Sequence, residues 1–272
     1  MHKVLYAALF GILEGVTEWL PISSTGHLIL LENFLNFPTR PAFFELFEVV
    51  IQLAAIGAVV VLYFEKLNPF AGKKASAQRK DTWRLWGFVL LATLPSAVIG
   101  LLLDDFLSEQ LFRPTVVACM LILYGIVFLF LGKRKSTPSP HERITKKSAL
   151  CVGTLQLLAL VPGTSRSGAT MLGGILAGLS RKRAAEFSFF LAIPTMLGAS
   201  ALKCVKFALK GNTLLQEELW MLAVGALVAF VTSLITIRFL MNFVKRHGFA
   251  GFGIYRIVLG VVVLLTLIPT KG

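Results

Sequence analysis

Long apolar stretches are the feature that most constrains the fold of this chain. Six of them are long enough to cross about 30 Å of hydrocarbon as helices that rise about 1.5 Å per residue. They lie at roughly 43–64, 85–103, 112–132, 184–205, 218–240 and 252–269. Only 15% of the 272 residues are charged, against about 25% in a typical soluble domain. The sequence therefore predicts an all-α integral membrane protein.

Two further apolar regions, roughly 3–35 and 147–178, are broken near their middle. Residues Pro21 to Gly26 interrupt the first region, and residues Pro162 to Gly168 interrupt the second. Non-helical backbone at membrane depth is tolerated only where protein or a watery cavity surrounds it. Each region is therefore predicted to form two short helices that dip into the membrane and return. We expect six transmembrane helices plus two re-entrant helix pairs.

The order of one re-entrant pair and three spans occurs twice along the chain. Gly11-x-x-Glu14 in the first half resembles Gly153-x-x-Gln156 in the second. An odd number of spans in each copy inverts the second copy relative to the first. We therefore expect a single membrane domain, 1–272, arranged as an inverted-topology repeat of about 1–132 and about 147–272. Such repeats place their site near the middle of the membrane, where the copies meet.

Basic residues predict the orientation of the chain. The net charge is +13, which we attribute to basic loops of a membrane protein and not to a nucleic-acid partner. Lys and Arg gather in loops 65–84, 132–147, 181–183 and 238–246, which the predicted spans place on one side. The positive-inside rule makes this side cytoplasmic. The first re-entrant pair then opens toward the periplasm or the cell exterior.

The first broken region carries two carboxylates. Glu14 and Glu18 are four residues apart, so they share one face of a helix. Their mutual repulsion in a low dielectric would be relieved by a shared proton, by Arg166 or by a divalent cation. Mg²⁺ or Ca²⁺ would suit these oxygen ligands, especially if substrate phosphates complete the shell. The alternative is a structural pair that backbone or water satisfies.

A histidine and two hydroxyls follow the carboxylates. His27 is a candidate base, acid or phosphoryl acceptor, although a lone histidine is commonly a packing residue. Ser23 and Ser24 either cap the second short helix or supply a nucleophile that His27 activates. We favour Ser24 as that nucleophile.

The turn in the second broken region is suited to an anion. Gly163 and Gly168 let backbone N–H groups approach a ligand, and the following helix directs its positive end toward the turn. Ser165 and Ser167 add hydroxyl donors, and Arg166 adds a planar fork for phosphate oxygens. Arg166 could also pair with a glutamate purely for stability. In the first full span, Glu48 and Gln52 either border the same cavity or hydrogen-bond helices together.

Both motifs resemble those of a known family. Glu14-Gly-x-Thr-Glu18-Trp-Leu-Pro-Ile-Ser-Ser-Thr-Gly-His27 and Pro162-Gly-Thr-Ser-Arg166-Ser-Gly-Ala-Thr170 are similar to the motifs of bacterial undecaprenyl-diphosphate phosphatases, the bacitracin-resistance family. The similarity extends along the full chain, including the segments around Glu48 and Glu186.

The resemblance implies an enzyme of the bacterial inner (plasma) membrane. It would remove the terminal phosphate of undecaprenyl diphosphate, with a divalent cation, and return the lipid carrier to cell-wall synthesis. The catalytic roles would fall on Glu14, Glu18, Ser24, His27 and Arg166. We expect substrate contacts from Ser23, Thr25, Gly163, Thr164, Ser165, Ser167 and Thr170, with Glu48 and Gln52 behind them.

A prenyl-phosphate transporter or flippase is the alternative function, because inverted repeats with re-entrant helices are transporter architecture. Glu14, Glu18 and His27 would then be proton-coupling groups. The expected partners are a polyprenyl diphosphate and membrane lipid, and a homodimer stays open. The sequence does not decide whether a serine, the histidine or water attacks the phosphate.

Overall fold

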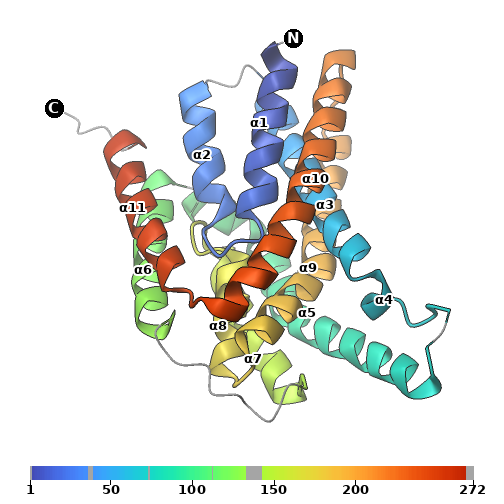
Figure 1. Ribbon diagram of the computed structural model, residues 1–272. Helices are drawn as coiled ribbons and strands as arrows, with labels where there is room; N and C mark the ends of the chain where they lie inside the picture. The colour runs from blue at the N-terminus through green and yellow to red at the C-terminus, as the bar shows by residue number, and fades with distance from the viewer. Residues whose placement is uncertain (1, 36–38, 73, 112, 133–142, 268–272) are drawn as a thin grey trace.

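The structure is a computed structural model that describes residues 2–35, 39–72, 74–111, 113–132 and 143–267 (Figure 1). All regular secondary structure in these ranges is helical. In chain order the helices are α1 (His2–Thr17), α2 (Ser24–Leu35), α3 (Pro41–Leu62), α4 (Phe64–Leu67), α5 (Ser76–Leu111), α6 (Pro114–Gly132), α7 (Lys146–Gln156), the 3₁₀ turn η1 (Leu157–Leu160), α8 (Arg166–Leu176), α9 (Arg181–Leu209), α10 (Gln216–Arg246) and α11 (Ala250–Leu267).

Four helices have the length and hydropathy to cross a membrane. They are α3, α5 over Ser76–Leu103, α9 and α10. Two shorter apolar stretches, Pro114–Phe130 in α6 and Ala250–Thr266 in α11, coincide with the other two predicted spans. The chain is therefore an all-helical, multi-pass membrane protein throughout the described ranges.

Helix α5 is longer than the sequence predicted. It begins at Ser76, where the predicted span began at 85, and it ends at Leu111, where the span ended at 103. Its first turns are charged, so an apolar criterion excludes them. No glycine or proline occurs before Gly87 to end the helix, so the helical hydrogen bonds continue through these turns.

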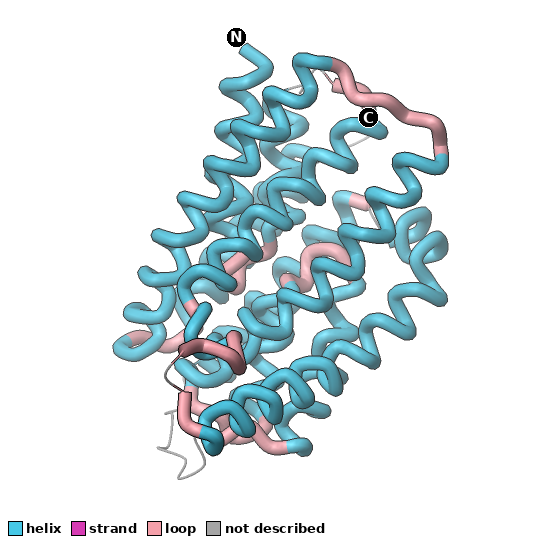
Figure 2. The backbone as a smooth tube through the Cα atoms, turned by 90° about the vertical axis from the view of Figure 1, so that its right-hand side faces the viewer, coloured by secondary structure: helices cyan, strands magenta, loops and turns pink. Residues whose placement is uncertain are grey.

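The two broken regions form short helix pairs that enter the bundle from opposite ends. In Figure 1, α1 and α2 descend from the upper end of the molecule, and α7 and α8 rise from the lower end. Their linking loops lie near the middle of the bundle, as Figure 2 also shows. Both regions are broken as predicted, but the non-helical residues are 18–23 and 161–165 and not 21–26 and 162–168, since α2 begins at Ser24 and α8 begins at Arg166.

Close packing anchors these pairs to the longer helices. Helix α1 packs along α10, α7 packs against α5 and α8, and α6 packs along α11. The loop after α1 is fixed by Trp19, which is fully buried and meets the Phe189 ring of α9 edge-on, with centroids 5.3 Å apart. The first loop therefore belongs to the core, although it has no regular structure.

The basic links gather at one end of the bundle. The links α4–α5, α8–α9 and α10–α11 all lie in the lower part of Figure 1, and the N-terminus lies at the top. Three of the four predicted basic clusters border these links, since 65–84 extends from α4 into α5, 181–183 begins α9 and 238–246 ends α10. Half of the basic residues of the fourth cluster, at 133–135, lie outside the described residues, and the other half lie just before and at the start of α7.

Candidate active site

The first loop begins where α1 loses its helical hydrogen bonds. The Glu18 N–H still donates to the Glu14 carbonyl at 3.0 Å. Pro21 has no N–H and constrains the residue before it, so the helix cannot continue through this point. Ser23 then adopts a φ of 73°, a region sparsely populated by residues other than glycine. This turn lets α2 begin at Ser24 and brings Ser24 back toward Glu18.

The second loop has a similar construction. Gly163 has a φ of 90°, and a Cβ at this position would lie 2.5 Å from the Val117 carbonyl oxygen of α6. Only glycine fits this approach. Ser165 has a φ of 72° and is the N-cap of α8, where its Oγ accepts a hydrogen bond from the Gly168 N–H at 3.2 Å. Arg166 is therefore the first residue of α8 and starts in the middle of the bundle.

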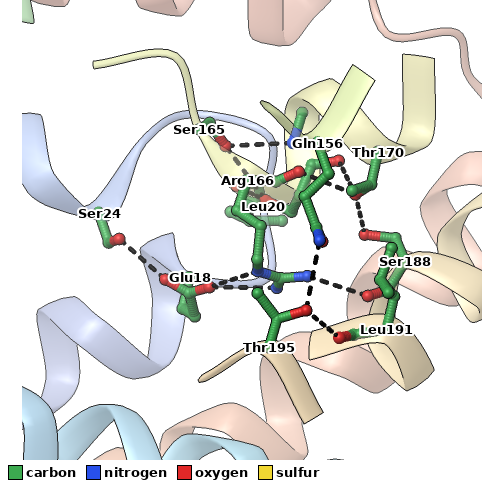
Figure 3. Close-up of polar contacts among 12 residues, drawn as sticks. Glu18, Leu20, Ser24, Gln156, Ser165, Arg166, Thr170, Ser188, Leu191 and Thr195 are labelled. Atoms are coloured by element: carbon green, nitrogen blue, oxygen red, sulfur yellow. Dashed lines mark hydrogen bonds and ion pairs between the residues drawn. The ribbon is translucent and has the colours of Figure 1, made fainter. Parts of the chain in front are cut away.

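An ion pair joins the two loops. In Figure 3, Arg166 extends toward Glu18, and its Nε and Nη2 lie 3.3 Å and 3.1 Å from Oε1 of that carboxylate. The other carboxylate oxygen, Oε2, accepts a hydrogen bond from the Ser24 hydroxyl at 2.9 Å. The side chains of Arg166 and Glu18 are only 11% and 6% exposed. One carboxylate thus contacts both a permanent cation and a potential nucleophile.

Helix α9 holds the other side of the Arg166 guanidinium. Its Nη1 donates to the Ser188 carbonyl at 2.9 Å, and the Ser188 and Thr170 hydroxyls lie 2.6 Å apart. Thr170 also donates to the Arg166 carbonyl at 2.8 Å. The Trp19 ring lies below the guanidinium carbon at 6.0 Å. Every direction of the guanidinium fork is fixed. Ser188 was not predicted, because an isolated serine in an apolar span carries no spacing signal.

The remaining polar residues of the two loops surround this pair. The Ser165 and Ser167 hydroxyls lie 3.2 Å apart, and Ser167 donates to the Leu20 carbonyl of the first loop at 3.2 Å. Thr164 is fully buried, and its hydroxyl has no hydrogen-bond partner within the described ranges. Thr25 is half-buried in the first turn of α2.

Glu14 differs from Glu18 in having no polar partner. It is 1% exposed, and neither carboxylate oxygen has a hydrogen-bond partner in the part of the chain that the structure describes. Gln52 lies half-buried one turn beyond Glu48 on α3. Whether Glu48 and Gln52 border the same cavity or hydrogen-bond helices together stays a prediction.

The carboxylates fit only one kind of metal site. Among the described residues, no group of three or more His, Cys, Asp or Glu side chains could hold an ion. Glu14 still offers two unpartnered oxygens, and Mg²⁺ is usually bound by one or two carboxylates together with substrate phosphates and water. The residues therefore fit a cation whose shell the substrate completes, and they do not fit an all-protein cage.

His27 does not contact the Ser24 hydroxyl that it was predicted to activate. Its Nδ1 lies 2.7 Å from the Ser23 carbonyl oxygen, and its Nε2 lies 2.7 Å from the Tyr255 hydroxyl of α11. The His27 and Tyr255 rings are stacked, with centroids 5.5 Å apart. In this conformation the basic partner of the Ser24 hydroxyl is Glu18. Tyr255 was not predicted as part of the site.

Arg256, the next residue of α11, was also missed. It is fully buried and donates to the Pro21 carbonyl at 3.2 Å and to the Gly163 carbonyl at 2.7 Å, one in each loop. The rings of Tyr124 and Phe128 lie 5.7 Å and 5.8 Å from its guanidinium carbon. The sequence did indicate Arg256, because an ionisable residue inside a predicted span is a candidate functional residue by default.

Gln156 occupies the position of Glu14 in the second copy of the proposed repeat, but it forms hydrogen bonds that Glu14 does not. Its amide Nε2 donates to the Ser96 hydroxyl at 2.5 Å and to the Thr195 hydroxyl at 3.3 Å. These contacts tie the end of α7 to α5 and α9. Helix α7 therefore has a neutral amide where α1 has a carboxylate.

Comparison with known proteins agrees with this site. The sequence profile of the family described as "Bacitracin resistance protein BacA" matches residues 7–262. The undecaprenyl-diphosphatase of Enterococcus faecalis is 54% identical over 262 residues, which are 95% of each chain. That of Streptococcus thermophilus is 51% identical, covering 96% of this chain and 92% of the relative. Undecaprenyl-diphosphatase 1 of Clostridioides difficile is 51% identical, covering 96% and 95%. The chain thus belongs to the BacA family of bacitracin resistance proteins.

Proposed function

We propose that this protein is a membrane phosphatase that hydrolyses undecaprenyl diphosphate to undecaprenyl phosphate and inorganic phosphate. The observation that carries the proposal is the contact chain from Arg166 through Glu18 to the Ser24 hydroxyl, which joins the two loops inside the bundle. Relatives about half identical over nearly the whole chain are named undecaprenyl-diphosphatase. The released lipid phosphate would return to cell-wall synthesis, which agrees with bacitracin resistance in the family's description.

The geometry suits the binding of a diphosphate. Arg166 is the first residue of α8, so its guanidinium and the N-terminus of α8 lie at the second loop, where they can neutralise phosphate oxygens. Phosphoryl transfer depends mainly on positioning and charge stabilisation. When the headgroup binds, its oxygens would replace Glu18 as partners of Arg166. Ser165, Ser167 and Thr164 would supply further hydroxyl donors.

The Ser24–Glu18 contact supports a covalent first step. The Ser24 Oγ attacks the terminal phosphorus, Glu18 Oε2 takes the hydroxyl proton, and the bond from phosphorus to the bridging oxygen breaks. The leaving group is undecaprenyl phosphate, which is weakly basic and needs no proton to depart. Water then attacks the phosphoserine, releases inorganic phosphate and restores the Ser24 hydroxyl.

A divalent cation, Mg²⁺ or Ca²⁺, would be held by Glu14 and Glu18 when substrate is present. It would supply charge neutralisation for the phosphate oxygens. The unpartnered oxygens of the Glu14 carboxylate support this proposal.

Two symmetric features support the inverted-topology repeat of about 1–132 and 147–272. Ser23 and Ser165 have nearly equal positive φ angles immediately before α2 and α8. Gly11 of α1 and Gly153 of α7 occupy matching motif positions, and a Cβ at either would lie 2.5 Å from a carbonyl oxygen of a long helix. On this basis the fold has six transmembrane helices and two re-entrant pairs in one domain.

The proposed location is the bacterial inner membrane, with the α1–α2 pair open to the periplasm or cell exterior. The shared end of the basic links supports this orientation through the positive-inside rule. The polyprenyl tail would stay in lipid while its headgroup enters between the loops.

The direct test is phosphate release from a polyprenyl diphosphate by purified protein in detergent. We expect turnover by the wild type, its loss with a chelator, and its recovery when Mg²⁺ or Ca²⁺ is added back. Ser24→Ala should abolish turnover. Ser200→Ala is the matched control, since Ser200 is a buried serine of α9 whose hydroxyl has no partner among the described residues. A transporter would move the lipid without releasing phosphate, and that result would overturn the proposal.

A further inference from the structure

We propose that Tyr255 is a positioning residue that acts through His27, holding the imidazole in one tautomer with Nε2 as a hydrogen-bond acceptor. The inference deepens the proposed phosphatase function and rests on it. Tyr255 contributes the hydroxyl that lies 2.7 Å from His27 Nε2 and the ring that stacks on the imidazole with an interplanar angle of 8°.

The hydrogen-bond partners determine where the imidazole proton lies. Nδ1 of His27 faces the Ser23 carbonyl oxygen at 2.7 Å, and a carbonyl oxygen can only accept. Nδ1 must therefore carry the proton. In the neutral ring Nε2 is then the unprotonated nitrogen, so the Tyr255 hydroxyl must donate to it. Both ring nitrogens have a defined role before any substrate arrives.

Burial favours this one tautomer of His27. His27 is 8% exposed, so water has little access to either ring nitrogen. Loss of the Tyr255 hydroxyl would leave Nε2 without its donor and would permit the other tautomer or a rotated ring. Deletion of one partner of a buried hydrogen bond is costly because the other group stays unsatisfied.

The structure also explains why Tyr255 can hold this position. The next residue, Arg256, is fully buried and bonded to the Pro21 and Gly163 carbonyls. Helix α11 is therefore fixed to the first loop within one residue of Tyr255. The stacked ring and the hydroxyl restrain the imidazole in orientation as well as in distance.

A fixed acceptor beside the first loop suits the second step of the reaction. That step needs a base for the proton of the attacking water, since Glu18 received the Ser24 proton in the first step. Nδ1 is committed to the backbone and Nε2 accepts from the Tyr255 hydroxyl, so Nε2 can take the proton of the attacking water only after that hydroxyl turns away and water reaches the ring. Tyr255 influences the reaction by setting which nitrogen is basic and where it points.

The test is a double-mutant cycle on phosphate release. Tyr255→Phe removes only the hydroxyl and keeps the stacked ring. We expect kcat to fall roughly tenfold with KM within about twofold, because the hydroxyl does not touch substrate. In a His27→Gln background, Tyr255→Phe should cause no further loss. Additive losses, or a wild-type kcat for Tyr255→Phe, would overturn the proposal.

Tyr63→Phe is the matched control. Tyr63, which follows α3, packs against Phe189 and Phe190 of α9 and is not one of the residues placed in the site. It should keep wild-type kcat. If Tyr255→Phe lowers the melting temperature in detergent and its kcat loss persists in the His27→Gln background, Tyr255 is a packing residue and the proposal fails.

A second measurement does not depend on turnover. ¹⁵N-histidine NMR of the protein should show one histidine protonated at Nδ1 and not at Nε2, a resonance that disappears in His27→Gln. Tyr255→Phe should shift its Nε2 signal, and Tyr63→Phe should not. An unchanged His27 signal in Tyr255→Phe would refute the positioning role. A wild type with this signal but no phosphate release would instead contradict the proposed function.

Discussion

Glu18 is the residue on which the site converges. It accepts hydrogen bonds from Arg166 and from Ser24, and it lies in the first loop while Arg166 begins α8. Removal of one partner of a buried ion pair typically costs about 3–5 kcal/mol, because the other charge stays buried. Both residues therefore matter to folding and to chemistry, and substitutions must preserve shape to separate the two.

We expect Arg166→Lys to lose nearly as much activity as Arg166→Ala, roughly a hundredfold or more in kcat/KM. Arg166 uses Nε and Nη2 toward Glu18 and Nη1 toward the Ser188 carbonyl. A lysine ammonium is a point charge and cannot hold these directions together. Steady-state phosphate release measures the loss. Lysine that retained most of the activity would show that Arg166 serves only as bulk charge.

The two carboxylates should behave as a unit if they hold a cation. Glu14→Gln and Glu18→Gln should each lower kcat and weaken the dependence on Mg²⁺ or Ca²⁺. The double variant should then be little worse than the poorer single variant. If the pair shares a proton instead, the single variants should move the pH profile and leave the cation requirement unchanged. Near-wild-type turnover in the double variant would assign both residues to structure alone.

At the scale of the element, the two loops were easier to predict than their contacts with α11. Pro21 and Gly163 mark the breaks because neither is compatible with a continuous helix there, one lacking an N–H and the other having a positive φ. The contact between Glu18 and Arg166 was among the alternatives weighed from charge alone. The direction of His27 was not predictable, because it depends on Tyr255, which is 228 residues away.

Arg256 should be essential for holding the two loops in their relative position. We expect Arg256→Met to lower the free energy of unfolding by roughly 2 kcal/mol or more, since it leaves the buried Pro21 and Gly163 carbonyls without their donor. Activity should fall with it. Thermal unfolding in detergent measures the change. Arg238→Met, an exposed position on α10, is the control and should be close to neutral. Equal melting temperatures for the two variants would contradict the role.

At the scale of the whole molecule, the orientation can be tested directly. We expect Thr213→Cys, in the α9–α10 link, to react with an impermeant thiol reagent from outside the cell, and Ser76→Cys, at the start of α5, to be protected. The background must lack Cys119, Cys151 and Cys204, which are free thiols. Strong external labelling at Ser76→Cys would reverse the orientation and the proposed access to the site.

Glu14 of α1 and Gln156 of α7 occupy matching positions in the proposed repeat, but only Glu14 is acidic. The two halves of the site therefore differ in charge. Gln156 is neutral and its Nε2 is bonded to Ser96 and Thr195, although its Oε1, like both Glu14 oxygens, has no partner among the described residues. A nearly symmetric ligand such as a tailless diphosphate would therefore enter an asymmetric electric field. Its two phosphorus atoms should become distinguishable by ³¹P NMR when bound, and the reaction should always cleave the same end. A protein built from two similar halves would in this way bind its diphosphate in one orientation only.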